Sequence, residues 1–115
     1  MCVYRAMARE CDPVWRELHY GRIQAGDAVE DVLGRTRPRR VERVGDWVLL
    51  KYHPDGLCFT GVTVVAREEH LVGAYAWSCG WVREFFDIMS PEQRTEFFRE
   101  HFDQPARLGD AIYIR

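Results

Sequence analysis

Several features that would point to a particular class of protein are missing from this sequence. No apolar run approaches the roughly 20 residues that a membrane-spanning helix needs. Arg5 and Arg9 lie where a secretory signal peptide would have its apolar stretch, so the sequence predicts a cytoplasmic protein with no membrane attachment. The chain has no internal repeat and no low-complexity segment, and its 115 residues fit one domain over residues 1–115.

The sequence also lacks motifs for catalysis and for cofactor binding. It contains no glycine-rich phosphate loop, no Ser/His/Asp arrangement and no pair of catalytic carboxylates. Its four cysteines include no closely spaced pair of the kind that holds zinc, so we expect neither a metal site nor a cofactor. Because a cytoplasmic compartment is reducing, the cysteines are predicted to be thiols.

A strong bias of charge toward one sign is missing as well. The formal net charge is −2, with 30% charged and 47% hydrophobic residues, which is the composition of an ordinary globular protein. A chain with this balance has no general attraction for polyanions, and this argues against a dedicated nucleic-acid-binding protein.

Two short helices are predicted in the first third of the chain. Asp12 and Pro13 form a helix start signal, and Gly21 is the corresponding stop. Asp27 begins a second helix, with a glutamate three residues later closing a capping box, and Pro38 ends it. The apolar residues of each segment recur at helical spacing, so each helix is expected to bury one narrow face.

Strand-forming residues dominate the middle of the chain. Three segments are predicted to form an antiparallel meander: 46–52, 58–67 and 71–78. A Pro-Asp-Gly turn separates the first two, and the acidic pair Glu68–Glu69 forms the tip between the second and the third.

The last third of the chain predicts two aromatic-rich helices and a short strand. Trp81, Phe85 and Met89 recur at helical spacing after Gly80, so a helix is expected there. Ser90 and the proline after it start a second helix that contains Phe97, Phe98 and Phe102. Residues 111–114 complete the order as an edge strand. The whole is an α+β domain in the order ααβββααβ, with helices packed mainly on one face of the sheet.

A glycine, an acidic helix and a tryptophan-led meander follow one another between Ile23 and Ser78. The residues of this pattern are Gly26, Glu30, Asp31, Val32, Pro38, Trp47 and Tyr52. The pattern resembles the SmpA/OmlA family of small outer-membrane assembly lipoproteins, whose fold is shared with the β-lactamase inhibitor proteins. The resemblance implies a similar arrangement of helices and sheet, with a sheet that can serve as a protein-binding surface.

Cys79 stands between two tryptophans in the sequence. The tip at Glu68–Glu69 sets a register in which Arg67 faces His70 and, further along the hairpin, Cys58 faces Cys79. Three interpretations of the cysteine pair are open: buried and reduced structural thiols, a disulfide or redox pair, or a nucleophile at Cys79. The first is favoured, because no histidine lies in a recognised local motif with Cys79 to activate it.

A basic segment separates the second helix from the first predicted strand. Its arginines are Arg35, Arg37, Arg39, Arg40 and Arg43. One interpretation is an exposed loop that contacts phosphate, in nucleic acid or in a small ligand. The other is a solvated loop that balances the acidic residues of the preceding helix or of the hairpin tip.

The aromatic residues of the last third suggest a contact surface. Adjacent rings such as Phe85 and Phe86 cannot both point into one core from a single helix. Either the two helices absorb their aromatics by packing on each other and on the sheet, or some rings form a hydrophobic groove or a dimer interface. The residues assigned to this surface are Trp81, Phe85, Phe98 and Phe102.

The leading functional hypothesis is a small non-catalytic protein-interaction domain, acting as an adaptor or scaffold. Its partner would be another protein or a second copy of the chain in a homodimer. One alternative is a thiol-dependent enzyme or redox protein that uses Cys79. The other is a phosphate or nucleic-acid binder that uses the segment from Arg35 to Arg43.

Overall fold

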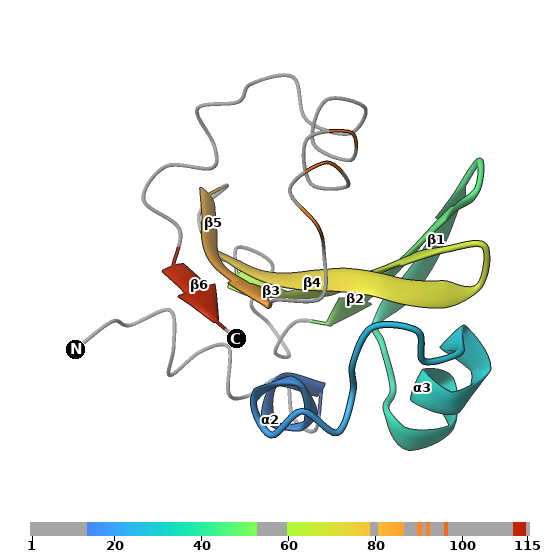
Figure 1. The fold of residues 1–115 in the computed structure, drawn as a ribbon, viewed down its shortest axis with the longest axis horizontal. Coiled ribbons are helices and arrows are strands. Elements are labelled where there is room, and N and C mark those ends of the chain that lie inside the picture. The colour runs from blue at the N-terminus through green and yellow to red at the C-terminus, as the bar shows by residue number, and fades with distance from the viewer. Residues whose placement is uncertain are drawn as a thin grey trace.

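The described part of the chain is mostly a six-stranded sheet with helices α2 and α3 on one face (Figure 1). The computed structural model describes residues 14–52, 60–78, 81–86 and 112–114, together with Ser90, Glu92 and Glu96. Helix α2 spans Val14–His19 and helix α3 spans Val29–Arg35. The strands are β1 (Arg40–Val44), β2 (Trp47–Tyr52), β3 (Thr60–Arg67), β4 (His70–Ser78), β5 (Trp81–Phe86) and β6 (Ile112–Ile114).

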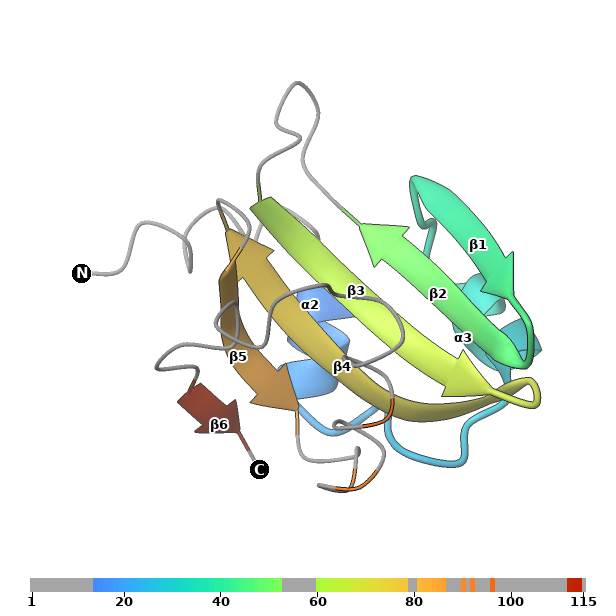
Figure 2. The ribbon, with the colours of Figure 1, turned by 90° about the horizontal axis from the view of Figure 1, so that it is seen from above.

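The strands follow one another in the sheet in the order in which they occur in the chain (Figure 2). Adjacent strands from β1 to β5 are antiparallel, and β6 pairs in parallel with β5. Strand β6 lies at one edge of the sheet, as expected for the last segment, and β1 lies at the other.

The predicted α+β order with a three-stranded meander and an aromatic helix from Trp81 is wrong. Residues Trp81–Phe86 form strand β5, in which Phe86 pairs with Ala74 and Phe85 with Tyr75 of β4. Successive side chains of a strand point to opposite faces, so Phe85 and Phe86 are both buried, one on each face of the sheet. A helix would have left one of these two rings at the margin of its buried face.

The structure describes the backbone of the second predicted aromatic helix at Glu92 and Glu96. Glu92 and Glu96 have helical backbone. The rings of Phe97, Phe98 and Phe102 lie outside the described residues.

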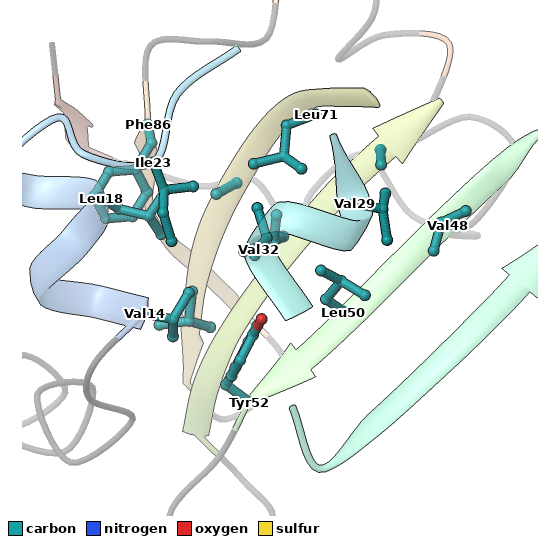
Figure 3. Close-up of a cluster of buried hydrophobic side chains, with 14 of the residues drawn as sticks. Val14, Leu18, Ile23, Val29, Val32, Val48, Leu50, Tyr52, Leu71 and Phe86 are labelled. Atoms are coloured by element: carbon teal, nitrogen blue, oxygen red, sulfur yellow. The ribbon is translucent and has the colours of Figure 1, made fainter. Parts of the chain in front are cut away.

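The larger core lies between the helices and the sheet (Figure 3). Helix α2 buries Val14 and Leu18 there, and α3 buries Val29 and Val32, which confirms the helical periodicity of both segments. The sheet contributes alternate residues of its central strands: Val48, Leu50, Tyr52, Val62, Val64, Ala66, Leu71, Ala74, Ala76 and Phe86.

A second, smaller core covers the opposite face of the sheet. It is formed by Trp47, Leu49, Val65, Tyr75 and Phe85, with Val72 and Trp77 packed against it. Burial on both faces explains why β2 to β4 are apolar almost throughout, and not only at every second position.

Helix α3 is anchored by the tip of the β3–β4 hairpin and not by the predicted capping box. Its N-cap residue is Ala28, which makes no side-chain cap hydrogen bond. The amide of Val29 instead donates to the carbonyl of Glu69 at 3.0 Å. The Oδ2 of Asp27 accepts a hydrogen bond from the amide of Gln24. The side chain expected to cap the helix therefore stabilises the turn before it.

A bulge changes the register of the β3–β4 hairpin. At the tip Arg67 faces His70 as predicted, but the pairing shifts between Val65 and Ala66, so that Thr60 faces Ser78. The predicted contact between Cys58 and Cys79 assumed one unbroken register, and that assumption is wrong. Both cysteines lie outside the described residues.

Candidate functional site

Strand β1 forms an open edge of the sheet. No strand in the described ranges pairs with its outer side, while its inner side pairs with β2 from Arg40 opposite Lys51 to Val44 opposite Trp47 (Figure 2). The turn Gly45–Asp46 joins the two strands, and Gly45 has a φ of 59°, which glycine adopts without steric cost. An edge strand offers its outward backbone donors and acceptors to another extended chain.

Two exposed valines flank this backbone edge. Val41 is 42% exposed and Val44 is 46% exposed. Residues directly opposite each other in a sheet share a face, so Val41, opposite Leu50, points to the side of the helices, and Val44, opposite Trp47, points to the other side. The edge therefore carries apolar surface on both of its faces.

Ion pairs hold the charged side chains of β1 in place. The carboxylate of Glu42 forms two ion pairs: its Oε1 lies 3.0 Å from the Nε of Arg40, and its Oε2 lies 3.1 Å from the Nζ of Lys51. Arg43 makes two hydrogen bonds to the carboxylate of Glu69, at 2.9 and 2.7 Å, and these bonds raise the pKa of its guanidinium. The ion pair between Arg43 and Glu69 connects β1 to the tip of the β3–β4 hairpin.

The arginines of the basic segment are distributed over different surfaces. Arg35 belongs to the helical side, where it donates to the carbonyl of Arg22 and lies 3.6 Å from Glu17. Arg40 and Arg43 differ by an odd number of residues in one strand, so they point to opposite faces of the sheet. Arg37 and Arg39 are exposed in the link between α3 and β1. The segment does not form a single basic patch.

A polar depression beside α3 has a volume of about 470 Å³. Its lining residues are Arg22, Asp27, Glu30, Asp31, Gly34 and Arg35. Charges of both signs line it, and Arg22 and Arg35 already pair with Glu17. Hydrogen bonds from Arg22 hold the pKa of Glu17 below its usual value. Arg35 also lies 3.7 Å from Asp27, so both basic groups of the depression are engaged by carboxylates of the chain itself.

A histidine and a buried glutamate join α2 to β5. The Nε2 of His19 lies 3.5 Å from the Oε2 of Glu84, whose side chain has no exposed surface. The ring of Trp15 stacks on the imidazole at 3.6 Å between centroids, and Phe86 meets it edge-on at 5.0 Å. The contact therefore places two titratable side chains between helix α2 and strand β5. The pair has no signal in the sequence, because no local motif links residues so far apart in the chain.

The aromatic surface expected to bind a partner is only partly described. Phe85 is 6% exposed and belongs to the smaller core, so it is not available to a partner. On the same face, Arg67 lies over the ring of Trp47 at 4.9 Å and donates to Glu96 at 2.9 Å. The side chains of Trp81, Phe98 and Phe102, and the whole of Cys79, lie outside the described residues.

The edge strand was missed although its turn has a sequence signal. The dipeptide Gly45–Asp46 is one of those that favour two-residue hairpin turns. It follows a segment that contains valine and precedes one that begins with tryptophan. The segment Arg40–Val44 was not predicted to be a strand, because its charged and apolar residues do not alternate regularly as they do in a half-buried strand.

Neither helix in the described ranges has the length and apolar character required to cross a bilayer. Within the same ranges, no group of three or more His, Cys, Asp or Glu side chains is placed to hold a metal ion. No protein-family model, curated protein or solved structure matches the chain significantly. The resemblance to the SmpA/OmlA family therefore stays a prediction.

Proposed function

We propose that the chain is a non-catalytic protein-interaction domain, and that an extended segment of a partner adds to its sheet along the outer side of β1. The supporting observation is the position of β1 at the end of the sheet, with Val41 and Val44 exposed beside its backbone. Main-chain hydrogen bonds provide affinity in this mode of recognition, and alternate side chains provide specificity.

The rigidity of the strand also supports the proposal. Strand β1 pairs with β2 along its whole length, and the contact between Arg43 and Glu69 links it to a second hairpin. The amide of Glu68 donates to the carbonyl of Asp46 at 3.1 Å, which joins the two hairpin tips. A preformed template loses less conformational entropy when it binds, so more of the contact energy appears as affinity.

Amide hydrogen exchange tests the proposal on the isotope-labelled full chain. We expect short strand-forming peptides, offered in acidic, neutral and basic versions, to slow the exchange of outward-pointing amides in β1, with no effect on α2. Such protection would arise because the added strand supplies carbonyl acceptors to these amides.

Proline substitutions serve as the blocked-edge control. The amides of successive residues in a strand point to opposite sides. Of the two variants Val41→Pro and Glu42→Pro, one therefore removes an N–H that points outward, and the other removes an N–H that points toward β2. The variant that keeps the β1–β2 pairing should lose peptide binding, whereas Tyr20→Ser, at an exposed residue of the helical side, should keep it. Protection of β1 by none of the peptides would refute the proposal, as would full binding by the blocked variant.

A further inference from the structure

Strand β1 and the residues just before it present positive charge to any neighbour. The exposed basic residues are Arg37, Arg39, Arg40 and Arg43. Glu42 is the one acidic residue in this stretch of sequence, and its two oxygens lie 3.0 Å from Arg40 and 3.1 Å from Lys51. Its charge is thus already compensated within the chain. Glu69 likewise pairs with Arg43, but the four arginines and Lys51 outnumber these two carboxylates, so an incoming strand would meet an edge with net positive charge.

The alternation of β1 side chains sets which residues a neighbouring strand must carry. Val41 and Arg43 point to the side of the helices, and Arg40 and Val44 point to the other side. Directly paired residues share a face and lie within contact distance, and opposite charges in such pairs attract. An acidic residue therefore fits opposite Arg40 and opposite Arg43, and an apolar residue fits opposite each valine.

We propose that the occupant of this edge is an extended acidic segment of another protein, with the order acidic, apolar, any, acidic, apolar alongside Arg40 to Val44. This inference rests on the proposed strand addition at β1 and names the chemistry of its partner. A second copy of the chain fits less well, because its own edge has one acidic residue, Glu42, which can face only one of the two arginines at a time.

Two synthetic peptides test the pattern against the full chain. Glu-Val-Thr-Glu-Val places its residues correctly for parallel pairing, and Val-Glu-Thr-Val-Glu does so for antiparallel pairing. Each carries a fluorophore, and a lysine-for-glutamate version of each is the control. We expect one acidic peptide to bind in fluorescence anisotropy and to protect β1 amides from exchange. Added salt should weaken this binding, since the charges involved are exposed.

Charge substitutions in β1 test the assignment of residues. Arg40→Gln and Arg43→Gln should each weaken acidic-peptide binding about two- to fivefold, the usual range for an exposed charge pair. The double substitution Arg40→Glu/Arg43→Glu should invert the preference, so that the lysine peptide binds better than the glutamate peptide. Arg35→Gln, on the helical side of the molecule, should leave the affinity unchanged.

The outcomes separate this inference from the proposed function. Equal binding of acidic and basic peptides to β1 would contradict the acidic partner while leaving strand addition intact. Concentration-dependent protection of β1 in the chain alone, with a doubled mass in sedimentation, would assign the edge to a second copy. Absence of β1 protection by every peptide would contradict both proposals.

Discussion

A buried hydroxyl pair shows how single residues hold α3 against the sheet. The Oγ1 of Thr36 lies 2.7 Å from the hydroxyl of Tyr52 and also donates to the carbonyl of Val32 at 2.9 Å. Both residues are 3% exposed. Burial raises the pKa of Tyr52 to about 12, because the phenolate would lose its hydration, and the hydrogen bond shared with Thr36 lowers the pKa by a smaller amount. The pair therefore connects the end of α3 to β2 in a form that favours the neutral phenol.

The raised pKa of Tyr52 predicts a loss of stability at alkaline pH. Below pH 10 the phenol is neutral in both states and its contribution is complete. From pH 10 to about 12 the unfolded state loses its proton first, so the free energy of unfolding falls by up to about 1.4 kcal/mol per pH unit. Urea denaturation at several pH values measures this slope.

Tyr52→Phe is the matched control for the alkaline slope. It should cost about 1 kcal/mol at neutral pH, since one buried hydrogen bond is lost. Above pH 10 the difference in unfolding free energy between the parent and Tyr52→Phe should shrink, because the variant lacks the titrating group. A constant difference across this range would contradict the assignment to Tyr52.

At the scale of an element, the β3–β4 turn stores backbone strain. Glu68 and Glu69 have φ values of 52° and 66°, a conformation that both central residues of a two-residue type I′ turn adopt and that asparagine or glycine normally occupies. The strain persists because backbone bonds hold both residues: the amide of Glu68 donates to Asp46, and the carbonyl of Glu69 accepts from Val29.

Relief of this strain should stabilise the protein. Glu68→Asn keeps the backbone hydrogen bonds and places a residue that tolerates positive φ, so the free energy of unfolding should rise by about 0.5–1 kcal/mol. Glu69→Asn should gain less, because it also removes the ion pair with Arg43. Thermal denaturation of the two variants measures the difference, and a lower stability of Glu68→Asn would count against a strained turn.

At the scale of the whole molecule, the sheet is buried on both faces. Leu49 and Leu50 are neighbours in β2 and are 5% and 0% exposed, the first in the smaller core and the second beneath the helices. Leu49→Ala and Leu50→Ala should therefore each lower the free energy of unfolding by about 2–5 kcal/mol. Chemical denaturation measures both losses.

Leu33→Ala provides the comparison for these two variants. Leu33 is 36% exposed on α3, so its truncation should cost well under half as much as either core substitution. A cost for Leu49→Ala as small as that for Leu33→Ala would mean that the second face of the sheet is open to solvent, contrary to the structure.

Local sequence determined the elements whose signals lie within a few residues of one another. Helices α2 and α3 follow from the helical spacing of their apolar residues, and β2, β3 and β4 follow from runs of strand-forming residues. The position of the Glu68–Glu69 tip was also predictable, because two polar residues interrupt two apolar runs. In each case the stabilising contacts are local or depend only on which residues are apolar.

Tertiary contacts decided the elements whose local pattern was ambiguous. The segment Trp81–Phe86 is apolar at helical spacing, yet pairing with β4 buries Phe85 and Phe86 on two faces at once, which no single helix could do. The shifted register of the β3–β4 hairpin likewise depends on a bulge, and no residue type at that place in the sequence predicts it.

The candidate site at β1 also depends partly on local sequence and partly on tertiary structure. The sequence alone indicated that the arginines before residue 44 are exposed, because charged residues rarely enter a core. Only the sheet decided that Arg40–Val44 is a strand, that it lies at an edge, and that its two arginines point to opposite faces. An edge is defined by the absence of a further strand beside it, and that is a property of the assembled sheet, which no short stretch of sequence contains.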